Sequence, residues 1–224
     1  MIDFTILAAG DAALVVQLDE RIDPALNAWC VALSERVRTE LGPSLRDTAI
    51  GYCSVTVYFN PQIIDSAWLE EEICAIAESI DAPDATHGAI VEVPVCYGGE
   101  LGPDLTDVAR FAGRSEEDVV ALHAGREYRV YLVGFIPGFA YMAEVDPAIA
   151  APRRATPRAA VPAGSVAIAG GQTGIYPAVT PGGWNVIGRT PLAPYDPRRP
   201  EPFLFRPGDR VRFHRIGEAD FQSW

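Results

Sequence analysis

The first eighty residues alternate between the hydrophobic patterns that distinguish strands from helices. Residues 4–8 and 13–18 are short apolar runs, and the sequence Ala9-Gly10-Asp11 between them is typical of a tight turn, so they predict a β-hairpin. Asp23 and Pro24 then suit the N-cap and the first turn of a helix. The apolar residues that follow have helical spacing and predict an amphipathic helix: Leu26, Trp29, Leu33, Val37 and Leu41.

A further strand and helix follow in the same region. Residues 52–59 alternate between apolar and polar side chains, which predicts a strand with one buried face. Apolar side chains at positions 69, 73, 76 and 80 again have helical spacing. The resulting order, ββαβα, suits two helices packed on one face of a sheet. We therefore predict a small ferredoxin-like α/β plait domain over residues 1–85.

A polar stretch without periodicity, residues 81–88, predicts a domain boundary. His87 lies in this stretch and is expected to be solvated. Beyond it, residues 89–97 predict a strand, and residues 104–111 and 115–123 predict two short helices. The sequence thus indicates that a second domain begins at residue 88.

Residues 131–191 are rich in glycine and proline, and no charged side chain lies between Arg158 and Arg189. The prolines exclude a membrane helix, because they remove backbone donors. Segments such as 165–169 instead predict short strands joined by tight turns, as in a small barrel or sandwich. Four arginines against two carboxylates give this window a formal charge of 4 − 2 = +2, although the protein carries −12. Such a local reversal of sign favours an anion site.

Composition excludes several classes of function. A net charge of −12 and a pI of about 4.6 argue against nucleic-acid binding. All 18 basic residues are arginine, so the chain cannot carry biotin, form a Schiff base, use a Walker lysine or act as a Ser–Ser–Lys amidase. The four cysteines lie about twenty residues apart and are expected to be reduced, without a metal site. The N-terminus is a poor match to a secretory signal, and we expect a cytoplasmic protein without membrane contact.

Eight ordered segments carry a resemblance to a known family: 94–100 (PVCYGGE), 102–105 (GPDL), 122–123 (LH), 132–141 (LVGFIPGFAY), 152–154 (PRR), 161–170 (VPAGSVAIAG), 172–177 (QTGIYP) and 181–191 (PGGWNVIGRTP). On these segments the sequence is similar to the B subunit of the ATP-dependent 5-oxoprolinase. The same family is also labelled allophanate hydrolase subunit 1 or kinase A inhibitor. Met142 and Glu144 depart from the family pattern without affecting the assignment.

The resemblance implies a cyclophilin-like β-barrel domain over residues 88–224, and hence an α+β protein. It also implies two partners, a larger C subunit of related cyclophilin-like barrel fold and a separate A subunit. The complex would open 5-oxo-L-proline to L-glutamate with ATP as co-substrate, and this chain would be inactive alone. Two alternatives stay open: a carboxyltransferase component that acts on urea or allophanate, and a binding protein that inhibits a sensor histidine kinase.

Opening an unstrained amide with ATP depends on positioned charge, which arginine forks and backbone N–H groups supply. We predict catalytic roles for His123, Arg153 and Arg158. Substrate binding is predicted for seven further residues: Arg154, Gln172, Thr173, Tyr176, Gly182, Gly183 and Arg189. For each arginine the alternative is an ion pair, and for the glycines it is a tight barrel corner.

His123 ends a predicted helix, whose C-terminus would stabilise a protonated imidazole. The alternative is a purely structural histidine. Phe135, Phe139 and Trp184 are expected in the core or against a partner. An exposed apolar face around these three would favour a partner complex, whereas a small pocket holding Arg153 or Arg158 would favour chemistry in this chain.

Overall fold

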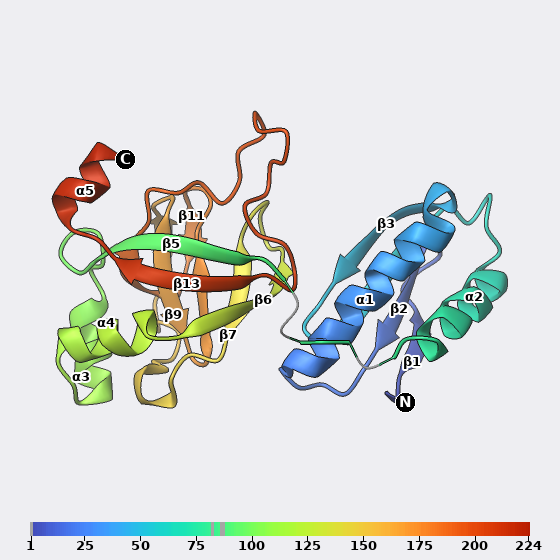
Figure 1. Ribbon diagram of the computed structural model, residues 1–224, viewed down its shortest axis with the longest axis horizontal. Helices are drawn as coiled ribbons and strands as arrows, with labels where there is room; N and C mark the ends of the chain where they lie inside the picture. Colours follow the sequence, from blue (N-terminus) through green and yellow to red (C-terminus); the bar gives the residue numbers. More distant parts are fainter. Residues whose placement is uncertain (1, 82, 86–87) are drawn as a thin grey trace. The chain divides into compact units, whose positions relative to one another are not determined.

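The computed structural model describes residues 2–81, 83–85 and 88–224. The chain divides into two compact units, Met1–His87 and Gly88–Trp224 (Figure 1). His87, expected to be solvated, lies outside the described residues. Within the described ranges, no helix is both long and apolar enough to cross a membrane.

The first unit is a four-stranded antiparallel sheet with two helices. Its strand order is β1-β2-β4-β3, so β1 and β3 form the edges. The elements are β1 (Thr5–Ala8), β2 (Ala13–Gln17), α1 (Pro24–Leu41), the short 3₁₀ helix η1 (Gly42–Ser44), β3 (Leu45–Ile50), β4 (Ser54–Phe59) and α2 (Ser66–Glu78).

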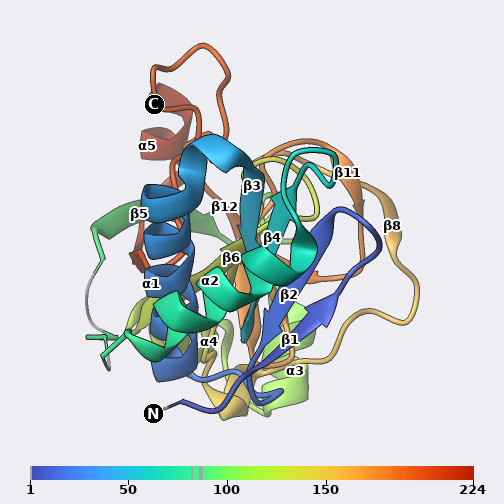
Figure 2. The ribbon, with the colours of Figure 1, turned by 90° about the vertical axis from the view of Figure 1, so that its right-hand side faces the viewer.

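Both helices pack on one face of this sheet, where alternate residues of β4 are apolar and buried. Val55 and Val57 of β4 are fully buried against Leu33 of α1 and its neighbours in one apolar cluster. Figure 2 shows α1 and α2 crossing the same side of the strands. The predicted cap is confirmed: the Asp23 carboxylate accepts hydrogen bonds from the backbone N–H groups of Ala25 and Leu26.

The predicted order ββαβα is wrong by one strand, β3, so the observed order is ββαββα. This order also differs from the βαββαβ order of a ferredoxin-like plait, and the plait is not confirmed. The missed strand lies at an edge of the sheet, and its exposed residues include Arg46 and Asp47. An edge strand that buries little apolar surface has no strong alternating pattern, which explains why the sequence did not reveal it.

The second unit is a closed seven-stranded barrel in the order β10-β7-β6-β13-β5-β12-β9. All neighbours are antiparallel except β13 and β5. The barrel strands are β5 (Ile90–Tyr97), β6 (Glu127–Val133), β7 (Ala140–Ala143), β9 (Ser165–Ala169), β10 (Gln172–Ile175), β12 (Asn185–Arg189) and β13 (Arg210–Arg215). This barrel confirms the α+β class and is consistent with the cyclophilin-like fold that the resemblance implies.

Further elements surround the barrel. The helices α3 and α4 pack against each other at one end of it (Figure 1), and β8 pairs with β11 in a separate two-stranded sheet. The additional elements are α3 (Leu105–Ala112), α4 (Glu116–Ala124), the 3₁₀ helix η2 (Pro147–Ile149), β8 (Arg158–Val161), β11 (Thr180–Gly182) and α5 (Glu218–Ser223).

The barrel wall has two apolar sides. Side chains such as Val95, Met142 and Ile168 belong to the barrel core. Phe139, Tyr176 and Trp184 belong to a second, smaller cluster with Ala167, which alternates with core residues along β9. Because successive side chains of a strand point to opposite faces, this second cluster lies on the outer face of the barrel.

A hydrogen-bonded histidine is buried in the barrel core. The Thr173 hydroxyl donates to the Ala167 carbonyl oxygen at 3.0 Å, so it accepts the hydrogen bond from His123 Nε2 at 2.9 Å. The other ring nitrogen, Nδ1, then accepts from the Tyr97 hydroxyl at 2.8 Å. The ring of His123 also packs 4.6 Å from that of Phe213, centroid to centroid. Every polar atom of the ring is thereby satisfied in the neutral form.

Burial lowers the pKa of His123 from 6.5 to about 3. The unfolded chain therefore binds this proton at a higher pH than the folded protein, and stability is lost as the pH falls below about 6.5. From this group alone, we expect the free energy of unfolding to fall by about 1.4 kcal/mol per pH unit between those two values.

Urea unfolding between about pH 7 and pH 4 measures this dependence. We expect His123→Gln to show a shallower pH dependence than the wild type, and His214→Gln, a substitution of an exposed histidine, to keep the wild-type slope. Equal slopes for the wild type and His123→Gln would contradict a buried neutral histidine.

Candidate functional site

A buried carboxylate, Asp104, joins three parts of the second unit. It lies at the N-cap of α3, its side chain makes no capping hydrogen bond, and only 1% of the residue is exposed. Asp104 exchanges two hydrogen bonds with Val186 of β12: its N–H donates to the Val186 carbonyl at 2.9 Å, and the Val186 N–H donates to its carboxylate at 2.7 Å. These bonds tie the start of α3 to the barrel wall.

Two arginines complete the pairing of this carboxylate. Arg158 binds both oxygens of Asp104 through its two terminal nitrogens, at 2.7 and 2.8 Å, and Arg154 donates to one of them. The hydrogen bond to Asp104 raises the pKa of Arg158. The ion pair that was the alternative for each arginine is observed for Arg154 and Arg158. A role of these two arginines in substrate binding or catalysis stays a prediction. A buried carboxylate needs such partners because burial removes its hydration.

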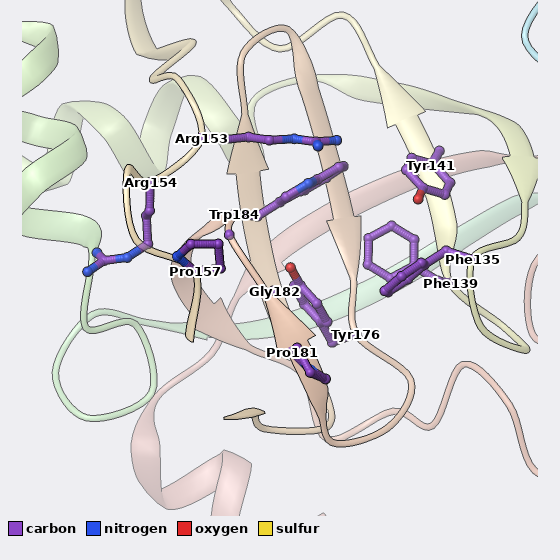
Figure 3. A pocket seen from close by; sticks show the side chains of 11 residues that line it. Phe135, Phe139, Tyr141, Arg153, Arg154, Pro157, Tyr176, Pro181, Gly182 and Trp184 are labelled. Carbon is purple, nitrogen blue, oxygen red and sulfur yellow. The ribbon is translucent and has the colours of Figure 1, made fainter. Parts of the chain in front are cut away.

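A pocket of about 240 Å³ lies on the outer face of the barrel (Figure 3). Its walls are the aromatic side chains of the outer cluster, and they meet mostly edge to face: Phe135, Phe139, Tyr141, Tyr176 and Trp184. Pro157 and Pro181 add apolar surface at its rim. No carboxylate is among the described residues that line it.

Arg153 is the arginine that faces this pocket. Its guanidinium carbon lies 5.9 Å from the centroid of the Trp184 ring, a cation–π distance. In Figure 3 the Arg153 side chain runs alongside Trp184 toward Tyr141, whereas that of Arg154 points away from the aromatic rings. Over the described part of the chain, Arg153 forms neither an ion pair nor a hydrogen bond through its side chain. Its charge is thus available to a ligand.

The backbone on both sides of Arg153 is tethered to the segment that carries Trp184. The Asn185 side-chain amide donates to the Pro152 carbonyl oxygen at 2.8 Å, and the Arg154 N–H donates to the Gly183 carbonyl oxygen at 2.8 Å. With the Arg154 side chain held by Asp104, the backbone at Arg153 is held beside Trp184 before any ligand binds. Pre-organisation of this kind reduces the entropy that binding costs.

Two tyrosines supply hydroxyl groups to the pocket. Burial raises the pKa of Tyr141 and of Tyr176, and the Arg153 charge opposes it in both cases. For Tyr176, a backbone hydrogen bond from Trp184 also opposes the effect of burial. Both side chains are therefore protonated at neutral pH and can donate hydrogen bonds.

Glycine is required at one position of the pocket wall. A Cβ atom at Gly182 would lie 2.3 Å from the Tyr176 hydroxyl and 2.8 Å from its ring, whereas one at Gly183 would meet Pro157 at an ordinary 3.6 Å. Neither glycine has a left-handed φ. Gly182 thus allows the Tyr176 side chain to lie close to β11.

Comparisons with known proteins agree with this structure. Residues 4–205 match the family described as the carboxyltransferase domain, subdomain C and D. The chain is 40% identical to the B subunit of 5-oxoprolinase from Bacillus subtilis (strain 168) over 229 residues, which is 96% of this chain and 94% of that protein. It is 41% identical to the B subunit of 5-oxoprolinase from Escherichia coli O157:H7, over 91% of this chain and 92% of that protein. The chain belongs to the family of 5-oxoprolinase B subunits.

Solved structures share the fold. The crystal structure of TTHA0988 matches 92% of this chain with a TM-score of 0.80 and 40% identity. The match covers only 40% of TTHA0988, so this chain spans less than half the length of that protein. The crystal structure of the K. lactis urea amidolyase also matches, with a TM-score of 0.80 over 99% of this chain, but at 19% identity the likeness concerns the fold alone.

Several site residues predicted from the sequence lie outside the pocket. His123 and Thr173 are fully buried in the barrel core and bonded to each other. The protonated imidazole expected at the end of α4 is wrong, because desolvation outweighs the favourable helix end. Gln172 begins β10 beside the Gly170-Gly171 turn and does not line the pocket.

Arg189 ends β12, where it is half-buried opposite Ser165 of β9. It is not among the residues that line the pocket. The predicted residues that the structure does bring together at the pocket are Arg153, Arg154, Tyr176, Gly182 and Gly183.

Two important residues of this family member were not selected from its sequence. Asp104 lies in a Gly-Pro-Asp-Leu segment, and nothing in the sequence pairs it with arginines fifty residues away. Tyr141 lies within the GFAY part of a family segment, and its place in that segment could have identified it as a candidate site residue. Within the described residues, no group of histidine, cysteine, aspartate and glutamate side chains could hold a metal ion.

We expect Asp104→Asn to destabilise the protein by about 2–4 kcal/mol, because it leaves two arginines facing a neutral amide at a buried site. Asp107→Asn is the matched control: its carboxylate is 55% exposed and pairs with Arg110, which is 73% exposed. Such a surface pair contributes at most about 1 kcal/mol. Denaturant unfolding of both variants checks this, and equal losses would contradict a central role for Asp104.

We expect Gly182→Ala to destabilise the protein by about 1–3 kcal/mol, because the new methyl group overlaps the Tyr176 side chain. Gly183→Ala should change the stability by less than about 1 kcal/mol, since its methyl group meets only ordinary contacts. Thermal unfolding monitored by calorimetry measures both. A Gly182→Ala protein as stable as Gly183→Ala would show that Tyr176 is free to move aside.

Proposed function

We propose that this chain is the B subunit of an ATP-dependent 5-oxoprolinase, which opens 5-oxo-L-proline to L-glutamate together with partner subunits. The observation that carries the proposal is the identity of 40% with a 5-oxoprolinase B subunit over nearly the full length of both chains. The pocket on the barrel supports it, because it combines a free arginine with protonated hydroxyl groups and apolar walls.

The chemistry proposed for the complex needs positioned charge more than a nucleophilic side chain. The lactam oxygen attacks the γ-phosphorus of ATP and ADP leaves, so the oxygen becomes part of a good leaving group. Water then adds to the activated carbon, and the ring C–N bond breaks with protonation of nitrogen, which leaves an acyl phosphate of glutamate. A second water hydrolyses this acyl phosphate to glutamate and phosphate. Arginine and backbone N–H groups stabilise the negative charge that develops in such steps. The Gly182-Gly183 backbone, which lines the pocket, is suited to this role.

The same proposal includes partners. A name that specifies a B subunit implies further subunits, and TTHA0988 contains a region similar to this chain within a longer polypeptide. We propose that a larger C subunit of related barrel fold and an A subunit complete the enzyme, that ATP binds to the complex, and that this chain is inactive alone. Phe135 and Val179 support an interface near the pocket, since they are 66% and 67% exposed despite being apolar.

Release of ADP and glutamate from 5-oxoproline and ATP tests this proposal. We expect turnover from the complete set of subunits, and none from this chain alone or from the partners without it. Turnover by the partners alone would contradict the proposal. So would a complete set that acts on urea or allophanate but not on 5-oxoproline, or a chain that only binds and inhibits a histidine kinase.

A further inference from the structure

The size of the barrel pocket limits the ligand. Its volume of about 240 Å³ is below the range of roughly 300 to 1,000 Å³ that is usual for drug-sized ligands. Its walls present the rings of Phe139 and Trp184, held edge to face with centroids 5.4 Å apart. A small, compact ring fits such walls better than a flexible chain, because apolar ring faces bury well against aromatic rings.

The charges around the pocket determine whether a cationic or an anionic ligand is favoured. Arg153 and Arg154 are the charged residues among those described that line it. The Arg154 guanidinium is bound by Asp104 and points away from the aromatic rings, which leaves Arg153 as the cation that faces the aromatic walls. Nothing that lines the pocket repels an anion, and the nearby hydroxyl of Tyr141 is protonated. An arginine fork binds a carboxylate through two parallel hydrogen bonds.

We propose that this pocket binds a small cyclic carboxylate, with Arg153 bonded to the carboxylate and the ring packed against Phe139 and Trp184. The choice of 5-oxoproline as that ligand rests on the proposed function, whereas the class of small cyclic carboxylates rests on the geometry of the pocket. In this arrangement Arg153 contacts the ligand. Asp104 is a positioning residue, because it holds the adjacent Arg154 and makes no contact with the pocket.

Titration calorimetry of the full chain with three ligands tests the contributions of the carboxylate and of the ring separately. 5-Oxoproline has both the carboxylate and the lactam, 2-pyrrolidinone lacks the carboxylate, and cyclopentanecarboxylate lacks the lactam. We expect both carboxylates to bind, and 2-pyrrolidinone to bind about tenfold more weakly than 5-oxoproline or worse, which is the usual loss for one charged hydrogen-bonding partner.

The variant Arg153→Met keeps the apolar stem of the side chain and removes the charge. Because Arg153 is exposed, we expect this variant to fold as the wild type does. Arg114→Met is the matched control, since Arg114 is exposed after α3 and does not line the pocket. We expect Arg153→Met to weaken binding of both carboxylates about tenfold or more, to leave 2-pyrrolidinone unchanged, and in the complex to raise KM for 5-oxoproline. Arg114→Met should match the wild type.

The possible outcomes separate this inference from the proposed function. If the complex turns over 5-oxoproline with a KM that Arg153→Met leaves unchanged, the pocket assignment is overturned and the proposed function stands. If Arg153 governs carboxylate binding but the complex does not act on 5-oxoproline, the proposed function fails and the carboxylate pocket stands. Failure of the chain and of the complex to bind any of the carboxylates overturns the inference.

Discussion

The pairing of Asp104 with Arg154 and Arg158 is the interaction on which the rest of the site depends. A carboxylate that is 1% exposed would be strongly unfavourable alone, and the two guanidinium groups and the Val186 N–H offset the loss of its hydration. The same bonds connect α3, the segment that contains Arg153, and β12. The bonds that compensate the buried Asp104 carboxylate thus also hold the pocket wall in place.

The apolar core and the proposed binding pocket lie on opposite faces of the barrel wall. The inner face holds the apolar core and one neutral histidine, whose hydrogen bonds link β5, α4 and β10. The outer face carries the aromatic cluster and the pocket. Since strand residues alternate between these faces, a residue such as Thr173 belongs to the interior while its neighbour Gly174 lies against Phe139 on the outside.

Arg153 has a different environment from the other arginines of its segment. Backbone hydrogen bonds at Pro152 and Arg154 hold the residues on either side of it, and the Trp184 ring lies next to its guanidinium. It therefore concentrates positive charge at one apolar pocket in a protein of net charge −12. This local positive charge favours small anions at the pocket.

The sequence alone was enough to predict the capped helix after Asp23 and the strands of the Gly/Pro-rich region, because these depend on local propensity and apolar periodicity. It was also enough to assign the family, because the family segments are recognisable in the sequence. The edge strand β3 was missed, since polar edge strands leave little pattern. Only the tertiary structure decided which arginine is free. Asp104 lies fifty residues or more from Arg154 and Arg158 in the chain and becomes their partner through the packing of α3 against β12. Likewise, the helix end near His123 suggested a charged imidazole, and burial in the barrel core made it neutral.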